Sequence, residues 1–357
     1  MVTDHVDRSD ADAFAERLFQ IINDGMLCLL ISVGHRTRLF DTMANLPPST
    51  SQAVATAAGL NERYVREWLG GMLAGGLLEY DRESKMFTLP QKHAAFLTRT
   101  AGADNMASLT RYVAMLGDVE DEIVECFSRG GGVPSSRYAK VLEVDRENIS
   151  EAADATLIDV TLPLVPGLLE RLHRGIDVAD VGCGIGHAIN VMARAFPASR
   201  FTGYDISQQS LAYGRAEAEA TGFRNARFED RDAAGLDGNP SFDFITTFDS
   251  IHDQADPATV LRGIARSLNS GGTYLCVDIA ASSDVGDNAT HPAGPLLYTY
   301  STMHCMPVSL VVNGAGLGSV WGEQLALRMF AEAGFSDVDV RRVDGDIINN
   351  YYICKTG

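Results

Sequence analysis

The sequence predicts an α/β protein, in which a doubly wound parallel sheet follows a smaller, mainly α-helical N-terminal domain. A strand pattern, three spaced glycines and a helix pattern occupy residues 176–195. Further strand patterns alternate with helices as far as residue 278, which is typical of parallel sheets, whereas the first 100 residues are mostly helical. The expected divisions are 1–100 for the N-terminal domain, 101–170 for a helical connector and 171–357 for the sheet domain.

The glycine turn is the feature around which the sheet domain is organised. Its sequence is Asp180-x-Gly182-x-Gly184-x-Gly186, between an apolar run and a helix pattern. Such a strand–turn–helix unit brings the backbone close to a ligand at a helix N-terminus. The dinucleotide-binding pattern would place its third glycine at position 187, which is His. This stretch alone is also compatible with a plain tight turn.

Acidic residues end several of the strands that follow. The run 200–205 ends in Asp205, whose carboxylate could accept hydrogen bonds from both hydroxyls of a ribose. The run 226–233 ends in Asp232 and Ala233, and the run 242–248 ends in Phe248 followed by Asp249. A glycine turn and a fifth strand pattern occupy 268–278. Each Asp alone could be an ordinary turn residue, but the ordered series is far more specific.

Together, these motifs resemble the class I S-adenosylmethionine-dependent methyltransferases, and mycobacterial and actinobacterial members of unassigned substrate in particular. The resemblance implies a Rossmann-like sheet closed by an antiparallel pair of strands at 337–343 and 347–354. It also implies S-adenosylmethionine as cofactor, with Asp205 on the ribose and Asp232 and Ala233 beside the adenine ring. The cofactor-binding residues that it implies are Asp180, Gly182, Gly184, Gly186, Asp205, Ile206, Asp232, Ala233, Phe248 and Asp249.

The N-terminal domain has the pattern of a winged helix. Residues 11–44 read as two helical stretches, and the second contains an apolar run at 26–33 that should be buried against its own domain or a partner subunit. Capped helix patterns at 51–58 and 61–73 precede a hairpin pattern at 77–89. Two helices followed by a hairpin form a winged helix.

Charge argues against DNA binding by this domain. The candidate recognition helix at 61–73 carries two Arg and two Glu, and a DNA-binding helix should present a basic stripe. Trp68 is expected in the core. The domain resembles the N-terminal dimerisation domain of small-molecule O-methyltransferases, which implies a homodimer. A transcriptional regulator that uses the methyltransferase fold as a ligand sensor remains the rival interpretation.

Composition predicts a soluble cytoplasmic protein, and the resemblance implies a small-molecule substrate. The net charge is −18, from 29 basic and 47 acidic side chains, which disfavours nucleic acid and membrane surfaces as partners. The six cysteines form no C-x-x-C pair, so neither a disulfide framework nor a zinc site is expected. The first residues lack the pattern of a signal peptide, and no uninterrupted apolar run approaches the length of a membrane span.

His252 is the candidate general base. It follows the fourth strand, and the segment 250–257 resembles the Leu-His-Asp-Trp segment of O-methyltransferases, whose His removes the acceptor proton. Gln254 replaces the Trp. The sequence identifies no carboxylate partner for His252, and Asp249, Asp253 and Asp278 show no spacing that requires a metal. The alternatives are a structural histidine, or N- or C-methylation by positioning alone.

The long segment at about 281–319 is expected to be an insertion that covers the substrate. It is rich in Gly and Pro, and such segments at the carboxyl edge of a parallel sheet often form binding loops. Tyr298, Met303 and His304 are the candidate substrate contacts. The simpler alternative is a surface helix whose aromatic side chains pack on the core.

Overall fold

The computed structural model describes residues 8–236, 239 and 241–357. The chain forms two compact units, Met1–Gly117 and Asp118–Gly357. The division between them falls inside the region expected to be a connector. The expected limits at residues 100 and 170 stay predictions.

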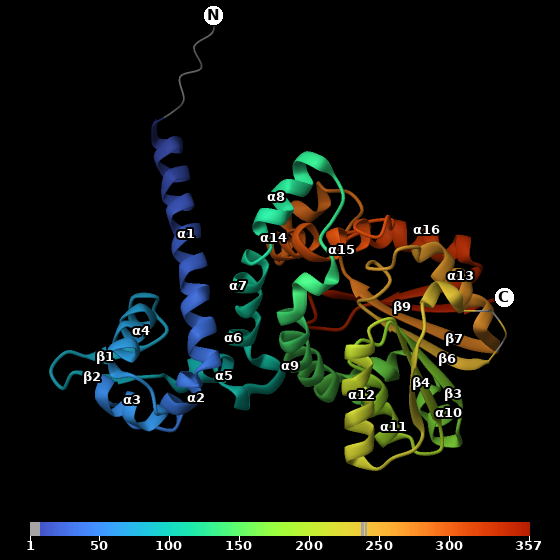
Figure 1. Cartoon of the computed structure of the whole chain (residues 1–357), viewed down its shortest axis with the longest axis horizontal. Helices are drawn as coiled ribbons and strands as arrows, with labels where there is room; N and C mark the ends of the chain where they lie inside the picture. The colour runs from blue at the N-terminus through green and yellow to red at the C-terminus, as the bar shows by residue number, and fades with distance from the viewer. Residues whose placement is uncertain (1–7, 237–238, 240) are drawn as a thin grey trace, which may run out of the picture. The chain divides into compact units, whose positions relative to one another are not determined.

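The first unit contains the predicted winged helix (Figure 1). Thr50 and Asn61 cap α3 and α4 by accepting hydrogen bonds from the N–H groups of Ala53 and Arg63. Trp68 is buried in the core, as predicted, and its indole N–H donates to the carbonyl of Leu30 at 2.9 Å. The elements of this unit are α1 (Arg8–Arg36), α2 (Leu39–Ala44), α3 (Ser51–Ala58), α4 (Glu62–Ala74), β1 (Glu79–Asp81), β2 (Met86–Thr88), α5 (Gln91–Leu97), η1 (Arg99–Asp104), α6 (Met106–Leu109) and α7 (Arg111–Gly117).

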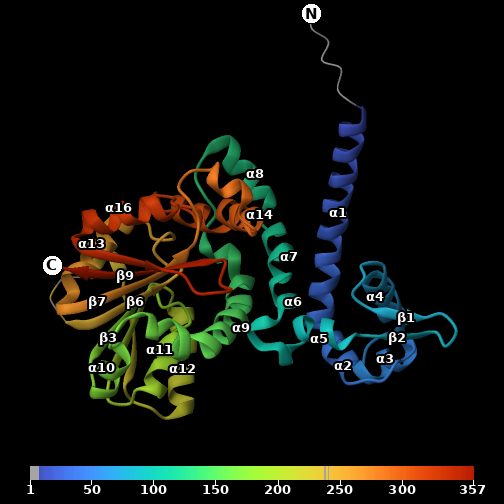
Figure 2. The same ribbon diagram turned by 180° about the vertical axis from the view of Figure 1, so that it is seen from behind.

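Helix α1 differs from the prediction. The two helical stretches expected within 11–44 begin as one helix of 29 residues, because Gly25 does not interrupt it. The apolar run 26–33 is only partly buried: Leu27, Leu30 and Ile31 pack against the core of this unit, whereas Met26 is 62% exposed. The first turns of α1 extend beyond the rest of the unit in both views (Figures 1 and 2).

The expectation that no segment could span a membrane is not upheld for α1. Among the described residues, its segment Asp10–Arg36 is long and apolar enough to cross a bilayer by length and composition. The bent pair Glu147–Leu164 and Leu168–Arg174 meets the same test only if it is counted as one broken span.

The second unit is built on a mixed sheet of seven strands in the order β5-β4-β3-β6-β7-β9-β8. The first five strands in this order are parallel, and β9 runs antiparallel to both β7 and β8. This confirms the predicted Rossmann-like sheet with its antiparallel closing pair. The strands are β3 (Asp177–Val181), β4 (Arg200–Asp205), β5 (Ala226–Asp230), β6 (Phe242–Phe248), β7 (Leu268–Ile279), β8 (Phe335–Arg341) and β9 (Asn349–Thr356).

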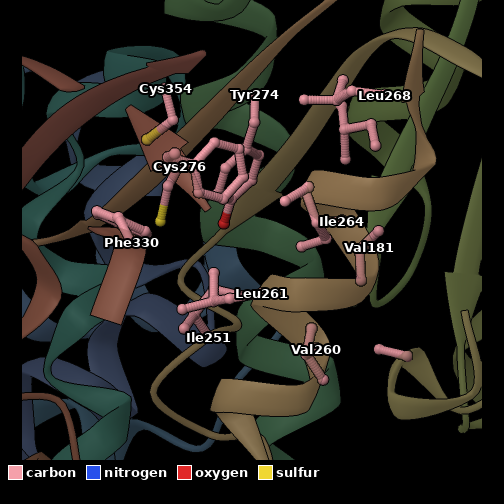
Figure 3. Packing of buried hydrophobic residues seen from close by; sticks show 14 of the residues in the cluster. Val181, Ile251, Val260, Leu261, Ile264, Leu268, Tyr274, Cys276, Phe330 and Cys354 are labelled. Atoms are coloured by element: carbon pink, nitrogen blue, oxygen red, sulfur yellow. The ribbon is translucent and has the colours of Figure 1, made fainter. Parts of the chain in front are cut away.

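Helices cover both faces of this sheet (Figure 2). One face packs against α10 (Leu168–Arg174), α11 (His187–Ala195) and α12 (Gln208–Thr221). The other packs against α13 (Pro257–Ser267) and α16 (Glu323–Ala333), where α13 side chains face Tyr274 and Phe330 (Figure 3). Because helices cover both faces of the sheet, strands β3, β4 and β6 are buried along most of their length. The acidic residues Asp205 and Asp230 end β4 and β5.

Two helical regions complete this unit. Before the sheet come α8 (Glu120–Arg129), η2 (Ser135–Tyr138), α9 (Ala139–Thr156), η3 (Leu157–Thr161) and η4 (Leu162–Leu164), and η5 (Ala233–Gly235) follows β5. The segment predicted as an insertion folds into η6 (Asp287–Thr290), α14 (Gly294–Tyr300), η7 (Ser301–Cys305) and α15 (Met306–Leu310). Segment η7 is a π-helical turn, a geometry that is frequent at functional sites.

Candidate active site

The glycine turn after β3 has the left-handed backbone that its sequence requires. Gly182, Gly184 and Gly186 have φ values of 73°, 53° and 72°. A Cβ added to Gly182 would lie 2.7 Å from the Cβ of Ser250, so the turn is packed against the segment after β6. A Cβ added to Gly184 would meet nothing within 4 Å. The turn is thus closed at its first glycine and open at its second, where a ligand can approach the backbone.

Asp205, at the end of β4, joins this turn directly. Its carboxylate accepts hydrogen bonds from the N–H groups of Gly184 at 2.9 Å and Ser207 at 2.8 Å. Burial raises the pKa of the Asp205 carboxyl, and these backbone hydrogen bonds oppose that shift. A carboxylate has about four acceptor positions, so lone pairs remain for a ligand diol.

Asp180 lies beneath the turn and is only 2% exposed. The hydroxyl of Thr246, on the neighbouring strand β6, donates to it at 2.8 Å. Burial raises the pKa of Asp180 to about 7, although the hydrogen bond from Thr246 lowers it. Asp180 thereby fixes the end of β3 to that of β6.

The remaining predicted cofactor residues lie at the carboxyl ends of β4, β5 and β6. Ile206 is 72% exposed, and Asp232 accepts the N–H of Ala234 at 2.9 Å at the start of η5, where Ala233 is buried. Phe248 is half-buried, and the next residue, Asp249, has φ 48°. A left-handed backbone is uncommon outside glycine and is found at functional sites. The residues predicted to bind the cofactor therefore lie around one edge of the sheet, and their role there stays a prediction.

His252 is held by a buried carboxylate that the sequence analysis did not assign to it. Its Nδ1 lies 2.7 Å from Oδ1 of Asp278, at the end of β7, and both side chains are almost fully buried. The same oxygen accepts the indole N–H of Trp321 at 3.0 Å and the backbone N–H of Ile279 at 2.8 Å. These donors fix the carboxylate, and the carboxylate fixes the imidazole.

The charges around His252 favour its protonated form. Burial alone would lower the pKa of His252. The negative charges of Asp278 and Asp253, with the hydrogen bond to Asp278, instead raise it well above its ordinary value. The signal for Asp278 was present in the sequence as an acidic residue ending the fifth strand, but its pairing with His252 depends on the order of β6 and β7 in the sheet.

The structure brings two of the three predicted substrate residues, Met303 and His304, into one cluster, whereas Tyr298 lies elsewhere. The His304 ring packs edge-on against Tyr138 with centroids 4.6 Å apart, and burial lowers the pKa of His304. The Tyr138 hydroxyl donates to the carbonyl of Met303 at 2.6 Å, so these three residues form one cluster. Tyr298 lies instead against Asn288, whose amide donates to its hydroxyl at 3.0 Å. Tyr138 was not predicted as a site residue.

Comparison with known families identifies two regions of the chain. Residues 25–99 match the family described as "Rv2258c-like winged HTH domain", and residues 172–334 match the family described as "Methyltransferase domain". The demethylmenaquinone methyltransferase of Listeria welshimeri is 31% identical over 112 residues, covering 31% of this chain and 48% of that protein. Methyltransferase GfsG of Streptomyces halstedii is 27% identical over 182 residues, covering 48% and 65%. The chain thus spans less than two thirds of the length of these relatives.

Solved structures match nearly the whole chain. Human N-acetylserotonin methyltransferase, in complex with SAM, aligns with a TM-score of 0.69 at 17% identity, covering 96% of this chain and 98% of that one. NcsB1, an O-methyltransferase from neocarzinostatin biosynthesis in complex with SAH and 1,4-dihydroxy-2-naphthoic acid, aligns with a TM-score of 0.61 at 18% identity, covering 92% and 96%. The chain therefore combines a methyltransferase domain with an N-terminal Rv2258c-like winged HTH domain, in the fold of S-adenosylmethionine-dependent methyltransferases.

Proposed function

We propose that this protein transfers the methyl group of S-adenosylmethionine to a hydroxyl oxygen of a small, partly apolar acceptor, with His252 as general base. The observation that carries the proposal is the buried His252–Asp278 pair in the segment that packs on the glycine turn. A base oriented by a carboxylate, beside a backbone turn open to a ligand, is what transfer to a hydroxyl requires.

The residues at the sheet edge fit the cofactor. The open face at Gly184 allows close approach of a ligand to the backbone, and Asp205 has lone pairs free for the ribose hydroxyls. Asp232 and Ala233 would lie beside the adenine ring. The bound cofactor supplies an electrophilic methyl group on a sulfonium, a good leaving group, so the protein must mainly position the acceptor and remove its proton.

In the proposed reaction the acceptor oxygen attacks the methyl carbon as the carbon–sulfur bond breaks, and the bonding pair goes to sulfur. The acceptor proton passes to Nε2 of His252. Asp278 holds Nδ1, so the ring must present Nε2 to the acceptor, and it stabilises the imidazolium that forms. The reaction needs no further reactant.

The aromatic side chains around His304, whose pKa is affected by the charge of His252, favour a flat, apolar acceptor. Tyr138, Tyr300 and His304 form an aromatic cluster, with the His304 ring centroid 4.6 Å from Tyr138 and 5.0 Å from Tyr300. Aromatic rings bind apolar rings with little loss of conformational freedom. NcsB1, whose bound ligand is a dihydroxynaphthoic acid, has the same fold. Phenols and hydroxynaphthoic acids are therefore the first acceptors to test.

The direct test is transfer of a labelled methyl group from S-adenosylmethionine to matched acceptors. Each phenol or hydroxynaphthoic acid is paired with its methoxy analogue, which has no free hydroxyl, and with the corresponding aromatic amine. We expect label on the phenolic compounds alone. Transfer to the amine or to ring carbon with equal efficiency would replace the oxygen acceptor by the N- or C-methylation alternative. Absence of transfer to every acceptor despite cofactor binding would favour a ligand sensor.

Asp205→Ala should weaken cofactor binding. Loss of hydrogen bonds between a charged carboxylate and the ribose should cost about 1–3 kcal/mol of binding free energy, measured by calorimetry. Asp230→Ala is a matched control, because Asp230 lies opposite Asp205 on strand β5 and bonds Gln208 instead of the glycine turn. Equal affinities of the wild type and Asp205→Ala would show that Asp205 does not hold the ribose.

We also propose that α1 forms a homodimer interface. Phe19, Ile22 and Met26 follow one another at helical spacing and are 66%, 56% and 62% exposed. Exposed apolar stripes of this kind mark interaction surfaces. A second copy fits better than a bilayer, because Asp24 lies mid-helix and the last turns are packed into the folded domain. In α4, Arg63 and Arg66 are paired with Glu67 and Glu62, which supports dimerisation over DNA binding.

Phe19→Asp combined with Ile22→Asp should convert a dimer to a monomer in analytical ultracentrifugation, because charges on an apolar interface are costly to bury. Val285→Asp, which changes an equally exposed apolar residue of the second unit, should leave the dimer intact. A wild type that is monomeric throughout the micromolar range, or that floats with lipid vesicles, would contradict the proposal.

A further inference from the structure

Three potential metal ligands converge at the proposed base. Among the described residues, His252, Asp253 and Cys305 each offer a ligand atom, and these atoms all lie within 4.8 Å of one another. His252 and Asp253 follow β6, whereas Cys305 ends the π-helical turn η7 more than 50 positions later. The fold of the insertion, and not a local sequence motif, brings the thiol to the base.

One pair of these ligand atoms already has the spacing of a tetrahedral zinc site, and the third atom lies within 4.8 Å of both. With Zn–N and Zn–O bonds of about 2.0–2.1 Å and a Zn–S bond of about 2.3 Å, neighbouring ligand atoms lie about 3.3–3.6 Å apart. Nε2 of His252 and Oδ1 of Asp253 are already separated by 3.5 Å. Within the described parts of the chain, that Oδ1 is a buried acceptor without a well-formed hydrogen bond, and the Cys305 thiol faces the same carboxyl. Buried polar atoms of this kind call for an explanation, and a bound cation supplies one.

The surroundings also match a metal centre. Asp278 holds Nδ1 of His252 at 2.7 Å, so Nε2 faces Asp253 and Cys305, and a carboxylate behind the histidine in this way recurs at zinc sites. A divalent ion with one thiolate, one carboxylate and a neutral imidazole has no net charge, which suits the buried position of His252 and Cys305. A thiolate ligand favours zinc over magnesium or calcium.

We propose that His252, Asp253 and Cys305 form a zinc-binding site, and that zinc bound there blocks methyl transfer. The ion would bind the Nε2 lone pair, which must otherwise take the proton from the hydroxyl of the methyl acceptor. His252 therefore cannot act as general base while it is a zinc ligand. Binding would release the thiol proton of Cys305. It would also tie the insertion to the segment after β6. The binding claim stands by itself, whereas the inhibition claim rests on the proposed function.

Binding is tested with Co²⁺ as a spectroscopic substitute in the full-length protein after chelator treatment. We expect tetrahedral d–d absorption, a thiolate charge-transfer band, and displacement of both by Zn²⁺. Cys305→Ser should abolish the charge-transfer band and weaken zinc binding about 100-fold or more, and Asp278→Asn should weaken it about 10–100-fold. Cys126→Ser, which removes a partly exposed thiol elsewhere in the same unit, should change neither. An unchanged spectrum in Cys305→Ser would overturn the site.

Inhibition is then measured as the loss of methyl transfer on titration with Zn²⁺, with rescue by chelator. Wild type and Cys126→Ser should lose activity as the site fills, and Cys305→Ser should need about 100-fold more zinc for the same loss. If the Co²⁺ spectrum is observed but no methyl transfer is found, the metal site is confirmed and the proposed function is contradicted. Methyl transfer that persists with zinc bound would show that the ion does not occupy the base.

Discussion

His252→Ala is expected to lower the rate of methyl transfer about 10²–10⁴-fold, the usual contribution of a general base. Cofactor affinity should stay the same, because the glycine turn and Asp205 are held by backbone hydrogen bonds that do not involve His252. The rate is measured at saturating S-adenosylmethionine with a hydroxylated acceptor identified as above, in buffer containing a chelator. Calorimetry reports cofactor affinity in the same preparations.

Two further variants make this result interpretable. Removing the imidazole leaves the buried carboxylate of Asp278 with fewer partners, and an unpaired buried charge is destabilising. His252→Asn retains a side-chain donor near that carboxylate, so it should unfold closer to the wild-type temperature and still lack a base. His173→Ala, on the exposed side of α10, controls for loss of a histidine elsewhere. If His252→Asn folds, binds cofactor and transfers at the wild-type rate, the mechanism is positioning and His252 is structural.

The parts of the fold that the sequence predicted best are those determined by local pattern. Strands β4 and β6 begin and end where the sequence placed them, at 200–205 and 242–248, because each is a short run with aromatic or β-branched residues between turn segments. The contact between Gly184 and Asp205 also follows from pattern, since a parallel sheet brings consecutive strand ends to one edge. Local sequence patterns were therefore sufficient to predict the sheet and the sheet edge where the cofactor is proposed to bind.

Contacts between distant segments could not be predicted in this way. Asp278 and Trp321 are separated by 43 positions, and their hydrogen bond depends on how the insertion and α16 fold back against β7. No sequence motif pointed to Cys305, because His252 and Asp253, which lie beside it in the structure, come from another segment of the chain. The single helix α1 was missed for a different reason: two apolar patterns were assigned to separate helical stretches, although they lie on one helix and a lone Gly costs a helix only about 1 kcal/mol.

Asp278→Asn should lower the rate about as strongly as loss of the base itself, although this residue does not touch the acceptor. A buried carboxylate holds the imidazole in the tautomer that leaves Nε2 unprotonated, and replacing it by an amide can reverse that tautomer. In other enzymes with a carboxylate-oriented histidine the cost is about 10⁴-fold. Asp278 is thus a positioning residue. Asp278→Glu retains the charge and should recover part of the rate.

The pH profile separates this role from a merely structural one. His252 is a base only when unprotonated, and Asp278 and Asp253 raise its pKa well above the ordinary value against the effect of burial. In the wild type, kcat/KM for the acceptor should therefore rise with pH through neutrality and level off above the raised pKa. Loss of the negative charge in Asp278→Asn lowers the pKa, so the rise should move to lower pH while the plateau falls. The profiles are recorded with chelator present and with folding verified at each pH. A lower plateau with an unmoved midpoint would mean that Asp278 supports the fold of the site but does not set the protonation of the base.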